Sequence, residues 1–519
     1  MLQESEVPEG WVSLTIQDVC DINPPKPKKG DIPDDASVTF VPMPAVDAEH
    51  GEISSPEIRP FSEVRSGFTA FRDGDVIMAK ITPCMENGKA AVAGGLVSGL
   101  GFGSTEFFVL RSNGSILPQY LFHHIRQVSF RELAESNMTG SVGQKRVPKE
   151  FIANAAIPLP PLAEQHRVVT AIEALFARLD ATNAHLERVP GILKQFRQAV
   201  LAAACGGRLT EDWRKETSEV QSASYLVEQC IRERNLATAL KKVNARQSER
   251  NDSKRPASFR RVGPKSSYKQ LPDTWEICYF EDIAASGKHA IKAGPFGSSL
   301  IKKDYVQEGY KIYGQEQVIR DDPEYGDYYI NEEKYQSLKT CKISSGDILI
   351  SLVGTIGKVL ILPDSCKPGI INPRLVKISL NLFISRDYIK LYLESPVAKR
   401  KMYNTSHGGT MEILNLKTIK ELPIPLPPLP EQHEIVYRVE ALFALADRIE
   451  AGVAAARAKT ETMRQSILAQ AFSGRLVPTE AELARQVGRE YEPASALLER
   501  IRSEKKEKMG RKGVQSTLV

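Results

Sequence analysis

Apolar residues recur at seven-residue spacing in two stretches of the chain, and each stretch begins just after a proline-rich segment. The first stretch has two such rows, which are Ile172, Leu179, Leu186, Leu193, Val200 and Leu175, Thr182, Val189, Phe196, Ala203. The second stretch keeps the spacing with smaller and more polar residues, namely Val439, Ala446, Val453, Thr460, Ile467 and Leu442, Ile449, Ala456, Met463, Gln470. This pattern predicts two long helices that pack on each other as an antiparallel coiled coil. The alternative, in which each helix lies on its own globular part, stays open.

Proline and glycine mark features inside and at the ends of these helices. Pro190 predicts a kink or a split in the first helix, because proline removes one backbone hydrogen bond. Gly206-Gly207 and Gly474 predict where the helices stop. Some forty residues at about 1.5 Å each make a helix of about 60 Å.

The proline-rich segment is itself a repeat. "IPLPPLAEQH" begins at Ile157, and "IPLPPLPEQH" begins at Ile424, 267 residues later. The same offset takes Gly207-Arg-Leu209 to Gly474-Arg-Leu476. We therefore interpret the chain as two copies of one module, in which each decapeptide is a stiff, polyproline-like hinge that leads into a helix.

The segment before each hinge has a different pattern. Short apolar runs such as Asp75 to Ile81 and Asp347 to Val353 predict strands, and Gly and Pro clusters separate them. The predicted fold class is α+β, with two globular domains joined by two long antiparallel helices and an internal pseudo-two-fold repeat. The predicted boundaries are 1–156 for the first globular domain, 157–209 for a hinge and central helix, 210–270 for a basic, partly helical linker, 271–423 for the second globular domain, 424–476 for a hinge and distal helix, and 477–519 for a helical, basic tail.

Length, cysteine content and charge limit which kinds of protein this chain can be. The 519 residues exceed what one hydrophobic core usually organises. The seven cysteines are odd in number and have no C-x-x-C spacing, which favours a reducing, cytoplasmic location and argues against disulfides or zinc. No apolar run is long enough for a membrane span. The net charge is only +5, so charge alone does not indicate nucleic-acid binding.

Catalytic motifs are not evident in the sequence. Asn23-Pro-Pro-Lys26 is similar to a methyltransferase motif but lacks its aromatic residue, and no glycine-rich cofactor loop precedes it. The histidines His123, His124, His166 and His433 lack companions at metal-ligand spacing. We predict no catalytic residues, no metal and no cofactor in this chain, and a role in recognition.

Taken together, these segments give the chain its family resemblance. The duplicated hinge and helix resemble the specificity subunits of type I restriction–modification enzymes. Pro8/Trp11 and Pro272/Trp275 at the module starts, the stretch Ala79 to Lys89, Gly294-Pro-Phe-Gly-Ser-Ser-Leu300, Gly354-Thr-Ile-Gly-Lys358 and "GGRLTEDW" (Gly206 to Trp213) also resemble segments of such subunits.

The resemblance implies a function. Each globular domain would be a target-recognition domain that reads one half of a split, asymmetric site in double-stranded DNA, and the helices would set the spacing. Two methyltransferase subunits, which use S-adenosylmethionine to methylate adenine N6, would dock on the helices. Motor-nuclease subunits that use ATP and Mg would complete the complex.

Basic and amide side chains in the globular domains are the candidates for phosphate and base contacts. In the first domain these are Lys80, Thr82, Lys89, Gln144, Lys145 and Arg146. In the second they are Lys292, Ser298, Lys302, Lys303, Gln315, Lys358, Arg374, His407 and Thr410. Two alternatives remain: a coiled-coil adaptor between proteins without DNA specificity, and a self-sufficient methyltransferase.

Overall fold

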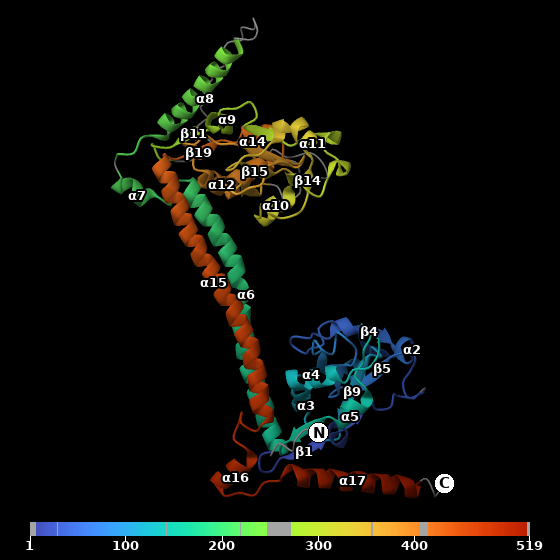
Figure 1. Ribbon diagram of the computed structural model, residues 1–519. Coiled ribbons are helices and arrows are strands. Elements are labelled where there is room, and N and C mark those ends of the chain that lie inside the picture. Colours follow the sequence, from blue (N-terminus) through green and yellow to red (C-terminus); the bar gives the residue numbers. More distant parts are fainter. Residues whose placement is uncertain are drawn as a thin grey trace. The chain divides into compact units, whose positions relative to one another are not determined.

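The computed structural model describes residues 7–28, 30–141, 143–217, 219–246, 271–353, 357–404 and 414–515. Its packing divides the chain into two compact units. Unit 1 comprises Met1–Glu187 with Ala454–Val519, and unit 2 comprises Arg188–Val453. Each unit contains one α/β head and a part of each of the two long helices (Figure 1).

The head of unit 1, called head 1 (residues 12–159), is built from three small sheets. A two-stranded sheet pairs the first strand of the head with its last, and two four-stranded sheets have the orders β2-β9-β6-β7 and β4-β3-β8-β5. The strands are β1 (Val12–Thr15), β2 (Cys20–Ile22), β3 (Ser37–Val41), β4 (Glu57–Pro60), β5 (Thr69–Arg72), β6 (Val76–Ala79), β7 (Ala90–Val92), β8 (Leu100–Gly103), β9 (Phe107–Ser112) and β10 (Ala156–Leu159). The helices are α1 (Ile16–Val19), α2 (Phe61–Val64), α3 (Pro118–Ile125), α4 (Val128–Ser136) and α5 (Lys149–Asn154).

The head of unit 2, called head 2 (residues 276–426), repeats this plan. The strands are β11 (Glu276–Cys278), β12 (Ile291–Ala293), β13 (Tyr310–Tyr313), β14 (Tyr329–Ile330), β15 (Ile348–Ser351), β16 (Val359–Ile361), β17 (Gly369–Ile371), β18 (Leu375–Ile378) and β19 (Ile424–Leu426). The helices are α9 (Phe280–Ile283), α10 (Gln315–Arg320), α11 (Glu332–Ser337), α12 (Arg386–Glu394), α13 (Pro396–Asn404) and α14 (Leu416–Lys420).

The two heads share a topology. The sheet order β12-β18-β15-β16 corresponds to β2-β9-β6-β7, and all neighbours in both are antiparallel. In the other sheet β13 pairs with β17 in parallel, as β3 pairs with β8. Strands β6 and β15 are buried along their whole length, which explains why they appear in the sequence as unbroken apolar runs.

The first part of each decapeptide is a paired strand of its head, β10 or β19, where a stiff, polyproline-like hinge was expected. Strand β10 pairs with β1, and β19 pairs with β11. The carbonyl oxygen of Pro158 accepts the hydroxyl of Tyr120 at 2.8 Å, and that of Pro425 accepts the hydroxyl of Tyr388. A two-stranded ribbon tolerates these prolines because each strand has a free edge.

The two long helices are α6 (Leu162–Cys205) and α15 (Leu429–Phe472). The antiparallel arrangement holds in each unit. In unit 1, Asp180 of α6 accepts Arg464 of α15, and Thr460 Oγ1 donates to Asn183 Oδ1 at 2.9 Å. In unit 2, Arg197 Nη2 donates to Asp447 Oδ1 at 2.6 Å. Asp180 and Asp447 are separated by the repeat offset, and so are Arg197 and Arg464, so the two ion pairs are copies of one contact.

One of the two apolar rows of each long helix is largely shielded from solvent, and we call it the inward row. The inward row of α6 contains the buried Ile172, Leu179, Leu193 and Val200 with the half-buried Leu186, and that of α15 contains the buried Val439, Ala446 and Thr460 with the half-buried Ile467. Leu175, Phe196 and Leu442 of the second row are half-buried. Ile449 and Met463 are instead 43% and 44% exposed, so they do not belong to a buried seam. Helix α6 also continues through Pro190, so the expected split is absent.

Four further helices follow the long ones: α7 (Glu211–Glu216), α8 (Ala223–Arg246), α16 (Glu480–Val487) and α17 (Ala494–Gln515). The first residue of α8 donates its N–H to Thr274 O at 2.9 Å, and the first residue of α17 donates to Gly10 O at 3.1 Å. Thr274 and Gly10 each precede a repeated tryptophan. The internal repeat therefore extends past the long helices to α8 and α17, which lie in the segments predicted as a basic, partly helical linker and a helical, basic tail.

Candidate nucleic-acid interface

Three chain segments of head 2 meet beyond the carboxyl ends of its strands. They are the loop after β12, the start of α10 after β13, and the turn between β17 and β18. The N–H of Asn372 donates to Tyr313 O at 2.8 Å, and a Cβ at Gly294 would lie 1.8 Å from Asn372 O. This edge of the head is therefore a tightly joined set of loops, which is where recognition residues are usually positioned.

Two candidates from the sequence lie together at this edge. Arg374 Nη1 donates to Gln315 Oε1 at 3.5 Å, and Gln315 Nε2 donates to Ser351 Oγ at 2.7 Å. Lys358 lies close to the same place, because its carbonyl oxygen accepts the N–H of Ser351 at 3.1 Å. The Arg374 and Lys358 side chains are exposed, so their charges are available to a polyanion.

Other candidates of head 2 are placed around this edge or fall outside the description. Ser298 lies in the loop after β12, and Lys302 and Lys303 follow it; all three are exposed. Lys292 lies within β12 opposite Lys377. His407 and Thr410 lie outside the described residues.

Head 1 has a corresponding edge. Lys80 N donates to Glu106 O at 2.9 Å, just as Leu352 N donates to Arg374 O at 2.9 Å in head 2. The segment that follows β6 pairs with residues 145–147, since Thr82 N donates to Lys145 O at 3.0 Å and Val147 N to Lys80 O at 2.9 Å. Five candidates that are far apart in sequence are thereby brought together: Lys80, Thr82, Gln144, Lys145 and Arg146.

These side chains differ in what they can offer to a ligand. Gln144 and Lys145 are exposed. Arg146 forms two bonds of 2.9 Å with the Glu106 carboxylate, and this interaction lowers the pKa of Glu106. Lys89 donates to Met43 O at 3.0 Å, so its ammonium is already engaged within the head. Among the five side chains brought together here, Lys145 is the exposed lysine.

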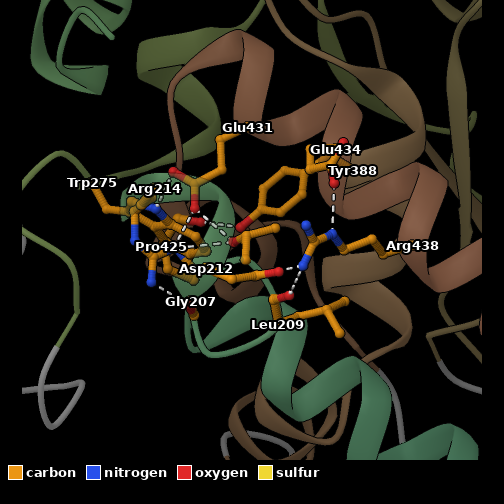
Figure 2. Close-up of polar contacts among 11 residues, drawn as sticks. Gly207, Leu209, Asp212, Arg214, Trp275, Tyr388, Pro425, Glu431, Glu434 and Arg438 are labelled. Carbon is orange, nitrogen blue, oxygen red and sulfur yellow. Dashed lines mark hydrogen bonds and ion pairs between the residues drawn. The ribbon is translucent and has the colours of Figure 1, made fainter. Parts of the chain in front are cut away.

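At the start of each long helix, a buried glutamate ties the helix to its head. In unit 1 Glu164 accepts the indole N–H of Trp11 at 2.9 Å and the backbone N–H of Glu480 at 2.8 Å. In unit 2 Glu431 accepts the indole N–H of Trp275 at 2.9 Å, the hydroxyl of Thr210 at 2.7 Å and the guanidinium of Arg214 (Figure 2). The repeated "EQ" of the decapeptide thus supplies an acceptor that joins the beginning of one long helix to the chain leaving the other.

The glutamine of the same motif satisfies loop backbone groups. Gln165 Oε1 accepts Leu117 N at 2.8 Å, and Gln432 Oε1 accepts Ser385 N at 2.9 Å. Gln165 Nε2 donates to Pro160 O at 3.0 Å, and Gln432 Nε2 donates to Pro427 O at 2.8 Å. The repeated motif is therefore a device for positioning a head on its helix.

Titratable groups outside this edge have structural roles. Burial lowers the pKa of His123 to about 3 and that of His124 to about 4, so both imidazoles are neutral near pH 7. Burial raises the pKa of the Cys20, Cys205 and Cys230 thiols to about 12, which makes them unreactive. Over the described part of the chain, no group of three or more His, Cys, Asp or Glu side chains is arranged to hold a metal ion. Among those same residues, no helix combines the length and apolar character needed to cross a bilayer.

Comparison with known proteins assigns the repeated architecture to one family. The model of the type I restriction modification DNA specificity domain matches residues 8–190 and again 272–456. The EcoBI specificity subunit of Escherichia coli is 33% identical over 382 residues, which are 72% of this chain and 69% of that protein. The EcoEI specificity subunit of Escherichia coli is 28% identical over 498 residues, which are 87% of this chain and 81% of that protein.

Solved structures share the fold. The HsdS subunit of Thermoanaerobacter tengcongensis has a TM-score of 0.55 at 20% identity and covers 91% of this chain and 99% of its own. A chain from a structure on complex assembly and conformational transition of the type I R-M system has a TM-score of 0.57 at 21% identity, covering 91% of this chain and 100% of its own. The chain belongs to the family of type I restriction–modification DNA specificity subunits and carries the specificity domain twice.

Proposed function

We propose that each head reads one half of a split site in double-stranded DNA, and that the long helices set the separation of the two halves. The observation that carries the proposal is the loop edge described above, which recurs in two heads of one topology with different side chains. Arg374 of head 2 occupies the position of Glu106 in head 1, as their matching backbone bonds show. Two heads with the same backbone topology but different side chains suit an asymmetric DNA site, because base edges are read by individual side chains.

The long helices would also receive two methyltransferase subunits. On α15 in unit 2 the residues Tyr437, Ala441, Leu445 and Ile449 follow each other at four-residue spacing. Tyr437 is 69% exposed, and Leu445 and Ile449 are each 43% exposed. An apolar stripe of this kind on an outward helix face fits the apolar face of a partner helix.

We assign the chemistry to the partner subunits. S-adenosylmethionine would be bound by the methyltransferase subunits, and ATP and Mg by motor-nuclease subunits, while this chain supplies recognition without catalysis. Methylation of adenine N6 requires the base to be extruded from the duplex, so a chain that holds the flanking base pairs would assist the partner. The assembly would work in the cytoplasm, where the seven free thiols stay reduced.

Methylation mapping tests the reading of two half-sites. The chain is expressed with its methyltransferase partner in a host that lacks DNA modification, and methylated adenines are mapped across the genome. The wild-type chain should give a two-part motif. Arg374→Ala should relax only one half, and the double substitution Gln144→Ala with Lys145→Ala should relax only the other. Lys417→Ala, at a side chain 80% exposed on α14, is the matched control and should leave both halves unchanged. Methylation without any two-part motif would refute the proposal.

Salt dependence tests the phosphate contacts separately. Each lysine that neutralises a phosphate contributes about 0.9 to the slope of log affinity against log salt, because bound counterions are released. Lys145→Ala should therefore lower the slope by about one unit for all duplexes. An unchanged slope would show that Lys145 does not contact a phosphate.

Assembly tests the docking stripe. Leu445→Glu with Ile449→Glu should lower the number of co-purifying methyltransferase subunits from two to one, because two charges would then face the apolar surface of the subunit that docks on unit 2. Arg457→Glu, at an exposed position of the same helix in unit 1, controls for charge alone. Retention of both subunits by the double variant would place the docking surface elsewhere.

A further inference from the structure

Phe296 is an exposed aromatic side chain at the edge of head 2 where the three loops meet, which we call the reading edge. It is 80% exposed and lies in the loop between β12 and Leu300. Only 7% of Leu300, four residues later, is exposed, so the loop buries one apolar side chain and presents another. Exposure of a whole phenyl ring forgoes about 1.5–3 kcal/mol of burial free energy, which suggests that a partner covers it in the working complex.

The loop holds Phe296 in a defined place. Gly294 N donates to Leu375 O at 2.9 Å, and Ser299 N donates to Phe296 O at 3.1 Å. A Cβ at Gly294 would overlap the Asn372 carbonyl, so the backbone is pressed against the turn that precedes Arg374. A side chain on such a loop loses little further backbone entropy when it binds.

The surroundings indicate what covers the ring. The loop touches the turn that carries Arg374, and Arg374 contacts Gln315. Lys302 and Lys303 follow the loop and are exposed. Basic and amide groups beside an apolar ring match duplex DNA, in which phosphates lie beside stacked bases and thymine methyl groups.

Head 1 presents different chemistry at the corresponding loop. Strands β2 and β12 take the same place in their sheets, beside β9 and β18. The segment after β2 is Asn23-Pro-Pro-Lys-Pro-Lys28, with three prolines and two lysines but no aromatic residue. An aromatic ring in one head and lysines in the other suits two heads that read different sequences.

We propose that Phe296 makes an apolar contact with a base in the half-site read by head 2. The inference rests on the proposed function and adds a base-contacting side chain that carries neither charge nor hydrogen-bonding group. Two contacts share this chemistry: packing of the ring on a thymine methyl group, and partial insertion between base pairs.

Binding measurements on the complete complex test the contact. The complex of this chain with its methyltransferase partner is titrated with a duplex carrying the methylated motif of the wild-type complex, and with a duplex that lacks it. Phe296→Ala should weaken binding to the motif by about 10-fold, as expected for loss of one base contact, and change binding to the other duplex less than about 2-fold. Unchanged affinity, or equal loss on both duplexes, would overturn the proposal.

Two modified duplexes separate the two forms of contact. Replacement of thymine by deoxyuridine removes the methyl group, and should weaken the wild-type complex but not Phe296→Ala if the ring packs on that methyl. A 2-aminopurine at each step of the half-site should brighten with the wild-type complex but not with Phe296→Ala if the ring inserts. Failure of both to distinguish wild type from variant would also overturn the proposal.

Controls keep this test distinct from the proposed function. Leu236→Ala removes an apolar side chain 65% exposed on α8 of the same unit and should bind both duplexes as wild type does. Methylation mapping of Phe296→Ala should relax one position in one half of the motif. A wild-type complex with no split motif would defeat the proposed function itself, whereas a wild-type motif that Phe296→Ala leaves intact would defeat only the role of Phe296.

Discussion

The indole nitrogen of Trp275 donates to Glu431 Oε2 at 2.9 Å across 156 residues of sequence. Trp11 and Glu164 repeat this bond in unit 1 at the same distance. In both units the tryptophan stands just before the first strand of a head and the glutamate in the first turn of a long helix. A buried charge-assisted bond of this kind fixes the head to the helix, because leaving the carboxylate without donors would cost its desolvation energy.

Loss of the indole donor should destabilise unit 1 more than unit 2. Trp11→Phe leaves Glu164 with the Glu480 N–H, whereas Trp275→Phe leaves Glu431 with Thr210 and Arg214. We expect a loss of about 1–3 kcal/mol in the free energy of unfolding for Trp11→Phe and a smaller loss for Trp275→Phe. Urea unfolding followed by circular dichroism measures both, with Trp213→Phe, at a half-buried tryptophan of α7, as control. Equal losses would show that Arg214 does not compensate.

Two glycines after the long helices should resist replacement. Gly207 and Gly474 have φ of +75° and +73°, and a Cβ would lie 2.6 Å from Pro272 Cγ and 2.4 Å from Pro8 Cγ, respectively. Gly207→Ala and Gly474→Ala should each lower the melting temperature, since strain at positive φ and a clash add together. Gly452→Ala, inside α15 with open space around it, should instead stabilise by about 0.5–1 kcal/mol. Tolerance of both loop substitutions would contradict the close packing.

Acid should weaken unit 1 through its buried histidines. The pKa values of His123 and His124 are about 3 and about 4 when folded, against about 6.5 when unfolded. Between these values the unfolded state binds more protons, so stability is fully present above pH 6.5 and is lost as pH falls toward 4. At pH 5 each histidine should cost on the order of 1–2 kcal/mol relative to pH 7.

Residues of head 2 provide the matched variant for this acid effect. His124 contacts Ala156 O at 3.1 Å, and Tyr392 donates to the corresponding Pro423 O at 2.6 Å. His123→Leu with His124→Tyr copies Leu391 and Tyr392 and should flatten the fall in stability between pH 7 and pH 5 in thermal unfolding. A variant with the same pH dependence as wild type would exclude these histidines as its source.

Matched insertions should change the spacing of the half-sites. Seven residues added to α6 after Glu187 and seven to α15 after Val453 keep the heptad phase and the antiparallel pairing on both sides. The added length of about 10.5 Å corresponds to about 3 base pairs. Methylation mapping should then show the same two half-sites with a longer gap. A changed half-site sequence with an unchanged gap would contradict the role of the helices as a spacer.

The repeat was the most informative feature of the sequence. Heptad spacing predicted the two long helices and the inward row from Ile172 to Val200, because a buried helix face imposes a period on apolar residues. Short apolar runs predicted the strands around Val76 and Ile348, which are buried on both faces. The heptad argument failed at Ile449 and Met463, since an apolar residue at heptad spacing can face either the other helix or solvent.

The pairing of the proline-rich segments and the composition of the reading edge could not be predicted without the tertiary structure. "IPLPPL" is typical of a stiff, polyproline-like segment, and only pairing with Val12–Thr15 and Glu276–Cys278 makes its beginning a strand. Lys80 lies about 60 residues from Lys145, and Gln315 lies about as far from Arg374. No local sequence pattern predicts that the members of either pair come together. The segment Gly294 to Leu300 resembles segments of other specificity subunits, and the structure shows that Phe296 within it is 80% exposed.

The duplication, the long helices and the family could all be predicted from the order of residues, because periodicity and repeated motifs are properties of that order. The tertiary structure decided which side chains share a surface and which partner each buried glutamate takes. These contacts depend on distances between segments that loops bring together, and distance through space is not encoded in spacing along the chain.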